Sequence, residues 1–243
     1  MELVLKINRM NPAEYFASLG VLELLSQQDP DILSHFAGDG IIVDFCVASA
    51  KDIALPDLRV LSVEALPFDD PFTAPVRCGA LELNWWLDVY RQKKNGHVLK
   101  LWAGTTTPCS MLKNYQSLMQ GECALNFNVK TKTKSTFNLD TRASRDPLTT
   151  GYSQKDAGEA SVLYPYAEFL CAIGLQNFRP QLKPLRYFTW ARPVRVGIAH
   201  AACRQDVPGL HSQGCEMSFA KVSQGMREVK SVVSLQQGTA AAF

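Results

Sequence analysis

The predicted fold depends most on residues 11–28, NPAEYFASLGVLELLSQQ. They predict a helix with a clear start, because Asn11 can cap it, Pro12 suits the first helical position and Glu14 can reach back to the cap. Apolar side chains recur at three- and four-residue steps, which indicates a buried face. Gly20 lies in the middle, where glycine costs roughly 1 kcal/mol relative to alanine. Its presence there indicates that another backbone approaches closely.

A similar pattern returns 154 residues further along the chain. Glu14–Val21 (EYFASLGV) aligns without a gap to Glu168–Leu175 (EFLCAIGL), and a proline, Pro12 or Pro165, precedes each copy. Two such helices far apart predict a pseudo-symmetric fold. In a ferredoxin- or RRM-like βαββαβ unit, small residues let the two helices pack side by side on one sheet face. The alternative is two ordinary amphipathic helices that match only by residue class.

The rest of the chain predicts an α+β fold with long insertions and β-hairpins. Alternating residues predict strands around the first helix, and a proline- and glycine-rich excursion follows them. We expect one domain, residues 1–243, that is rich in insertions over approximately 48–160. The predicted strands are Glu2–Ile7, Ile41–Val47, Leu81–Tyr90, Val98–Trp102, Arg186–Val196 and a hairpin within Met217–Leu235, and a further helix is predicted at Cys109–Gln120.

Composition indicates an ordinary globular protein. The hydrophobic fraction is 47%, and no apolar run reaches the length of a membrane span or forms a leader. The seven cysteines are scattered singly, which fits reduced thiols better than a disulfide framework or a zinc site. We therefore expect a cytoplasmic location.

Charge is distributed unevenly along the chain. Residues 1–88 hold 5 Lys/Arg and 14 Asp/Glu, whereas residues 89–243 hold 20 Lys/Arg and 9 Asp/Glu. This predicts an acidic surface at one end and an anion-binding surface at the other, the alternative being plain solvated surface.

Basic and aromatic residues are interleaved in the second part. Within Leu125–Leu139, three lysines recur at period two, so on a strand their ammonium groups would line one face about 6–7 Å apart. Cations that neutralise phosphates, together with aromatic faces for stacking, are typical of single-strand binding. The alternative is that the aromatic rings are core and the cations a solvated face. The predicted nucleic-acid-binding residues are Lys93, Lys94, Lys100, Trp102, Lys130, Lys132, Lys134, Arg142, Arg145, Arg186, Trp190 and Arg192.

No catalytic constellation is evident in the sequence. The four histidines, at positions 35, 97, 200 and 211, have no cysteine or carboxylate at metal-ligand spacing, and there is no phosphate-binding glycine motif. We therefore expect no catalytic residue, no metal and no cofactor. The alternative is an RRM-like endoribonuclease that uses His97 or His35 as a general acid or base.

Four segments, in order along the chain, resemble one family. They are similar to the small Csb-type subunits, of the third Csb family, in CRISPR–Cas effector complexes of subtype I-G (formerly I-U). The chain differs at Thr105–Thr107, where the family pattern has glutamines, and at the C-terminus. The matching segments are NPAEYFASLGVLEL (11–24), LKLWAG (99–104), FNLDTR (137–142) followed by GYS (151–153), and YP at 164–165 with EFLCAIGLQNFRP (168–180).

The resemblance implies a non-catalytic subunit of a guide-RNA-bound surveillance complex, with an RRM-like core of the repeat-associated (RAMP) type. Its partners would be guide RNA, possibly target DNA, and the other protein subunits of the complex. The motif residues carried over are Lys100, Trp102, Asp140 and Arg142, and the last two could simply pair with each other. A protein-only adaptor, docking a basic partner through its acidic part, is a further alternative.

Overall fold

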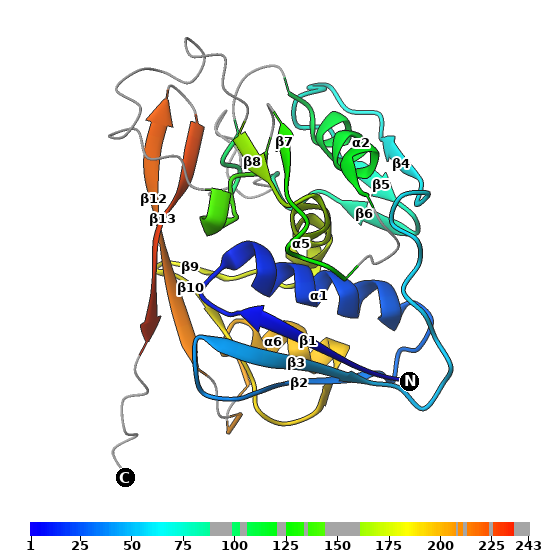
Figure 1. Cartoon of the computed structure of the whole chain (residues 1–243), viewed down its shortest axis with the longest axis vertical. Helices are drawn as coiled ribbons and strands as arrows, with labels where there is room; N and C mark the ends of the chain where they lie inside the picture. Colours follow the sequence, from blue (N-terminus) through cyan, green and yellow to red (C-terminus); the bar gives the residue numbers. More distant parts are fainter. Residues whose placement is uncertain are drawn as a thin grey trace.

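The computed structural model shows a mixed α+β protein (Figure 1). The described part of the chain contains four α-helices, one short 3-10 helix and several antiparallel sheets. The predicted α+β class is therefore confirmed. The residues described are 1–87, 99–102, 106–120, 125–133, 136–143, 161–207, 209–210, 213–223 and 226–235.

Helix α1 spans Pro12–Ser26, close to the predicted bounds. The side chain of Asn11 accepts a hydrogen bond from the Ala13 N–H at 3.3 Å and so caps the helix, as the sequence predicts. Every residue from Pro12 to Leu25 is buried. The predicted apolar stripe is thus only part of the buried surface, because other elements surround the helix on all sides.

Helix α5, Pro165–Asn177, is the predicted second copy, and it packs directly against α1. The two helices meet at their equivalent glycines. A Cβ atom added to Gly20 would lie 2.0 Å from the Leu170 carbonyl oxygen, and one added to Gly174 would lie 2.0 Å from the Phe16 carbonyl oxygen. Phe16 and Leu170 are themselves equivalent in the repeat, so the contact is pseudo-symmetric. The prediction of paired glycine-bearing helices is confirmed.

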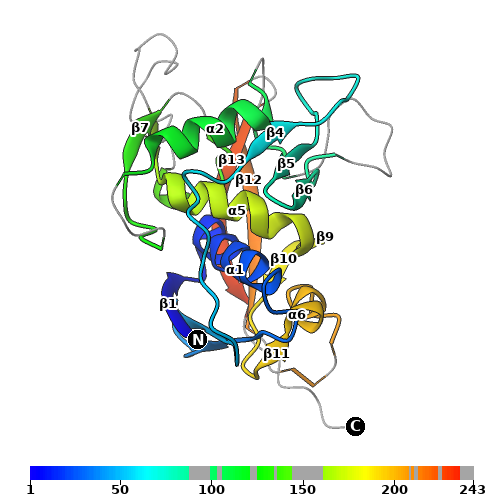
Figure 2. The ribbon, with the colours of Figure 1, turned by 90° about the vertical axis from the view of Figure 1, so that its right-hand side faces the viewer.

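The position of α5 relative to the first sheet differs from the expectation. The two helices were expected side by side on one sheet face. Instead, α5 lies on the side of α1 that faces away from strands β1 (Glu2–Asn8), β2 (Leu33–Ala37) and β3 (Ile42–Ala48) (Figures 1 and 2). Helix α1 is therefore a central layer. On one side of α1, the ring centre of Tyr15 lies 5.5 Å from that of Phe36 and 4.4 Å from that of Tyr187. On the other side, Gly20 contacts α5.

The first sheet has the strand order β1-β3-β2-β11. Strands β1 and β2 both pair antiparallel with β3, which lies between them. The sequence prediction located β1 and β3 but missed β2, whose residues alternate between buried and exposed over only five positions. The strands are β1 (Glu2–Asn8), β2 (Leu33–Ala37), β3 (Ile42–Ala48) and β11 (Val194–Arg195).

The second sheet, β13-β12-β10-β9, contains the predicted C-terminal hairpin as its longest pair. The predicted strand Arg186–Val196 is in fact two strands, β10 and β11, in different sheets, and helix α6 (Val196–Ala202) follows it. Pro193 precedes β11, in agreement with its role as a strand breaker. The strands are β9 (Gln181–Leu182), β10 (Leu185–Phe188), β12 (Gly214–Ser223) and β13 (Met226–Leu235).

The predicted irregular excursion contains a small sheet of its own, β4-β5-β6. The strand predicted over Leu81–Tyr90 ends early, and Trp85 and Trp86 follow it as fully buried side chains. The Trp85 indole donates to the Ala172 carbonyl of α5 at 2.9 Å, which fixes this sheet to the helix pair. The elements are β4 (Val63–Ala65), β5 (Val76–Cys78), β6 (Leu81–Leu83) and the predicted helix, here α2 (Pro108–Leu118).

The long alternating stretch Leu125–Leu139 is only partly a strand. Within its described residues, β7 (Thr131–Thr133) is the single strand, and it pairs antiparallel with β8 (Ser161–Leu163). A 3-10 helix, η1, covers Thr141–Ala143. The strand predicted at Val98–Trp102 is not regular structure over the described positions 99–102. Among the described helices, none combines the length and the apolar character that crossing a bilayer requires.

We expect Gly20→Ala and Gly174→Ala each to lower the free energy of unfolding by about 3 kcal/mol. Each added methyl group would overlap a backbone carbonyl of the facing helix, and only a separation of α1 from α5 relieves that overlap. Chemical denaturation followed by circular dichroism measures the loss.

The matched control is Gly197→Ala, because a Cβ atom there has no neighbour within 4 Å. This control should be neutral or stabilising by up to about 1 kcal/mol, since alanine favours helix. Equal effects at all three glycines would show that the helices do not cross as closely as described.

Candidate nucleic-acid interface

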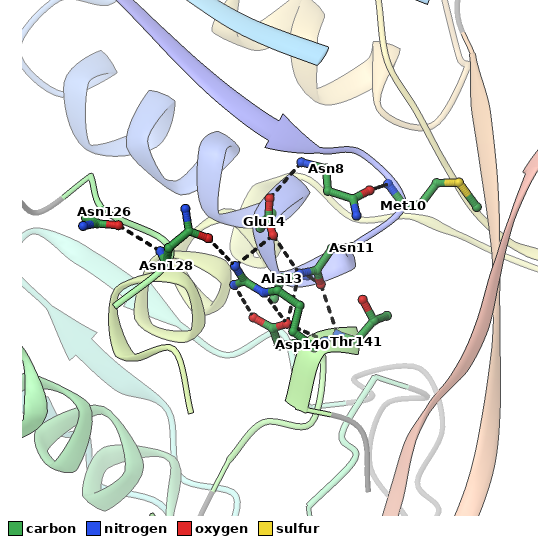
Figure 3. Close-up of polar contacts among 10 residues, drawn as sticks. Asn8, Met10, Asn11, Ala13, Glu14, Asn126, Asn128, Asp140 and Thr141 are labelled. Atoms are coloured by element: carbon green, nitrogen blue, oxygen red, sulfur yellow. Dashed lines mark hydrogen bonds and ion pairs between the residues drawn. The ribbon is translucent and has the colours of Figure 1, made fainter. Parts of the chain in front are cut away.

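A charged cluster joins the N-terminal ends of α1 and α5. Asn11 and Glu14 come from the start of α1, and Asp140 lies directly before η1 (Figure 3). Arg142 belongs to η1, and Glu168 comes from the first turn of α5. Three of these side chains are carboxylates, and each belongs to a residue that is at least nine-tenths buried. The repeated helices bring Glu14 and Glu168, equivalent in sequence, to the same part of the molecule.

The Arg142 guanidinium is the centre of this cluster. Its Nη2 and Nε atoms donate to Asp140 at 2.6 and 3.0 Å, and its Nη1 lies 3.0 Å from both Glu14 Oε1 and Asn128 Oδ1. One face lies 3.7 Å from the ring centre of Tyr164, a cation–π contact. Burial alone would lower the pKa of Arg142, but hydrogen bonding and charge pairing with Asp140, then Glu14, raise it. Its donors are thus occupied within the chain.

Asn11 connects the helix cap to the same motif. Its side-chain amide donates to Asp140 Oδ1 at 3.0 Å and to Glu14 Oε1 at 3.1 Å. Its carbonyl oxygen accepts from the Thr141 N–H at 3.2 Å as well as from α1 (Figure 3). Asn11 therefore caps α1 and also hydrogen-bonds to the η1 segment, which is distant in the sequence. The pairing of Asp140 with Arg142, left open by the sequence, is present.

Among the described residues, Glu168 has the carboxyl group with the largest pKa shift. Its side chain is fully buried, and Oε2 accepts a 3.2 Å hydrogen bond from the Phe137 N–H. Among the described residues, Oε1 has no hydrogen-bond partner. Burial, and secondly the negative charge of Asp140, raise the pKa of Glu168 to about 8. Glu168 is therefore mainly protonated at neutral pH, which lowers the repulsion within the cluster.

A groove of about 300 Å³ lies beside this cluster, between strand β1 and the segment before β7. Its walls are the residues Leu3–Lys6 of β1 and Leu125–Asn128, with Glu14 between them. Two of these residues, Glu14 and Asn128, also contact Arg142. The motif thus supports one side of an open groove whose lining is mostly polar.

Lys100 and Trp102 were predicted to contact nucleic acid, but the structure places the Trp102 ring in the core. Only 5% of Trp102 is exposed, and its ring packs edge-on against Trp85, Trp86 and Phe137. It offers no open face on which a base could stack. Lys100 lies with its Nζ 5.7 Å from the centre of that ring. Burial lowers the pKa of Lys100, and the charge of Asp70 partly opposes this shift.

The lysines at the β7 strand are placed differently. Lys130 and Lys132 are exposed, and neither forms an ion pair with a described acidic residue. Lys132 is paired in the ladder with Val162 of β8, which is also exposed. Lys134 lies outside the described residues. We call Lys130 and Lys132 on β7 and its flank the lysine ribbon.

The predicted binding residues Arg186, Trp190 and Arg192 are divided between core and surface. Trp190 is fully buried: its indole donates to the Ser34 carbonyl at 2.9 Å, and its ring stacks on Phe178. Arg186 pairs across the strands with Glu216, with Nη2 at 2.7 Å from Oε2. Arg192 is exposed and forms no ion pair with any described residue. Lys93, Lys94 and Arg145 lie outside the described residues.

Two of the four histidines, His35 and His200, lie in the described part of the chain. His35 is half-buried on β2, while the Nε2 of His200 contacts Glu23 and its ring packs edge-on against Phe178. His97 and His211 lie outside the described residues. No group of three or more potential metal ligands was found among the residues that the structure describes.

Sequence reasoning missed several contributors to the cluster. Asn128 and Tyr164 complete the surroundings of Arg142, and nothing in their local sequence distinguishes them from other polar and aromatic residues. The equivalence of Glu14 and Glu168 in the repeat was a usable signal that both carboxylates matter. Comparison of the chain with protein-family models, curated proteins and solved structures gives no significant match.

We expect Arg142→Lys to lower the free energy of unfolding by about 2 kcal/mol or more, because a lysine cannot contact Asp140, Glu14 and Asn128 at once. The matched control is Arg59→Lys. Arg59 pairs with Asp57 at the same two-residue spacing, with Nε and Nη2 at 2.9 and 2.8 Å from its carboxylate, but both side chains are exposed. That control should change stability by less than about 0.5 kcal/mol. Urea denaturation of both variants tests the difference.

The raised pKa of Glu168 makes stability depend on pH. The folded state holds a proton that the unfolded state releases near pH 4.5, so this contribution is present below that pH and is lost as pH rises through about 8. The free energy of unfolding should fall by at most about 1.4 kcal/mol per pH unit through this one group. Glu168→Gln should remove the loss and be more stable than the original chain at pH 8 to 9. Parallel pH dependences for the two proteins would contradict the burial of an ionisable group here.

Proposed function

We propose that this protein is a non-catalytic subunit of a type I CRISPR–Cas RNA-guided surveillance complex and that it contacts the guide RNA or target DNA backbone. The proposal starts from the resemblance of four segments to small Csb-type subunits. The structural observation that supports it most is the lysine ribbon: Lys130 and Lys132 are exposed and have no acidic partner among the described residues. Unneutralised cations at regular spacing attract a polyanion.

The ferredoxin/RRM-like core of the RAMP type is part of the same proposal. It is supported by strands β1 and β2 flanking β3 with α1 as their connection, the order of a split βαβ unit, and by the second helix of the same sequence pattern. The arrangement departs from a regular unit in its fourth strand, because β11 joins at β2 and leaves β1 as the edge. The departure concerns the second half of the unit.

In this proposal, the motif residues Asp140 and Arg142 and the lysine ribbon have different roles. Asp140 and Arg142 hold the η1 segment against the start of α1, and Arg142 also packs on Tyr164 at the start of α5. The β7 strand lies shortly before that segment and pairs with β8, which leads directly into α5. The motif would therefore fix the base of the ribbon, while the ribbon itself contacts phosphate. Because lysine contacts phosphate without reading base edges, this binding would be independent of sequence.

We expect the triple variant Lys130→Ala/Lys132→Ala/Lys134→Ala to weaken binding of single-stranded RNA. Loss of three phosphate contacts should reduce the slope of log affinity against log salt by about 2, at about 0.7 for each contact to a single strand. Fluorescence anisotropy with a labelled, unstructured RNA at several KCl concentrations measures both quantities, with the isolated chain and with the chain assembled in its complex.

The control is Lys51→Ala/Arg59→Ala, which removes two cations that already pair with Asp29 and Asp57. Its salt dependence should equal that of the unmodified chain. An unchanged slope in the triple variant would contradict the role of the ribbon. A chain that binds no RNA or DNA, alone or in a complex, would instead be a protein-only adaptor.

A further inference from the structure

Strand β1 is an open edge of the first sheet. Among the described strands it pairs with β3 only, and in Figure 2 it lies at the left-hand edge of the first sheet. No described residue hydrogen-bonds to the backbone on its other side between Glu2 and Lys6. An exposed edge presents a row of free N–H and C=O groups, to which a further strand can pair.

The register shows which residues present these groups. The Ser49 N–H donates to the Met1 carbonyl and the Arg9 N–H to the Ile41 carbonyl, so the odd-numbered residues of β1 bond to β3. Glu2, Val4 and Lys6 therefore point their backbone groups to the open side. Asn8 would continue this series, but its N–H already donates to Glu14 Oε2 at 2.8 Å. The free edge is thus limited to the three residues before it.

The side chains of these three residues are complementary to a second copy of themselves. All three are exposed, Val4 by 52%, and they lie on the sheet face opposite α1. If two β1 strands pair antiparallel with Val4 opposite Val4, each Glu2 lies opposite the Lys6 of the other copy. Opposite charges directly across an antiparallel pair are favourable, and apolar β-branched residues pack well there.

We propose that two copies of this chain associate through their β1 edges, so that the first sheet continues across a twofold axis at Val4. The contact is isologous: the same three residues act on both sides, with two Glu2–Lys6 ion pairs and one Val4–Val4 contact. The interface does not require the lysine ribbon or any nucleic acid.

The expected affinity is modest. A single pair of short strands buries less surface than the roughly 1,200–2,000 Å² of a stable protein–protein interface. Association should therefore be reversible and visible at micromolar to millimolar protein concentration. Its dependence on two charge pairs provides a specific test.

The experiment measures self-association of the full chain by sedimentation equilibrium over that concentration range. Glu2→Lys and Lys6→Glu each place like charges opposite one another twice and should weaken self-association at least about tenfold. An equimolar mixture of the two variants should form a heterodimer as tightly as the original dimer, because unlike charges then face each other at both positions. The double variant Glu2→Lys/Lys6→Glu should also associate as a homodimer.

Two controls separate this contact from general effects. Glu82→Lys, an exposed charge reversal on β6, should leave association unchanged. Lys6→Glu also places a carboxylate opposite Asp44 of β3, so its folding is checked by circular dichroism, and recovery in the mixture separates the interface from that neighbour. A monomeric original chain at every concentration, or a mixture that fails to recover association, would overturn the proposal.

Discussion

The close crossing of α1 and α5 is the constraint on which the structure depends. Backbone meets backbone at Gly20 and Gly174, with no room for a Cβ atom on either helix. Because α1 is also covered by aromatic side chains of two sheets, it forms the central layer of the molecule. Segments separated by more than a hundred residues are held in one core by this contact.

The crossing also creates the charged cluster. Two helices that pack with equivalent residues in contact bring their first turns near each other, and each first turn carries a glutamate. Several buried carboxylates close together are unfavourable unless a positive charge or a proton neutralises them. Arg142 supplies a positive charge to Glu14 and Asp140, while Glu168 is neutralised by protonation because its pKa is raised to about 8. The motif residues therefore serve the fold first.

Charge and aromatic character have separate roles in the structure, although they alternate in the sequence. The tryptophans at 102 and 190 fill the core, because large apolar rings contribute most when buried. Lys130 and Lys132 remain at the surface, because burying an unpaired ammonium group is costly. The proposed contact with a phosphate backbone would use these exposed cations and no aromatic stacking. The open β1 edge is a second, independent surface.

Elements with local or repeated signals could be predicted from the amino-acid pattern alone: the capped helix α1, its copy α5, strands β1 and β3, the C-terminal hairpin and the place of the glycines. These are fixed by periodicity, capping and backbone freedom, which act within a few residues. Three features became known from the folded chain: which aromatic rings are buried, that α5 lies beyond α1 rather than beside it on the sheet, and that Arg142 is enclosed by Glu14, Asn128 and Tyr164. Those outcomes depend on contacts between distant segments, and a single sequence contains no local signal for them.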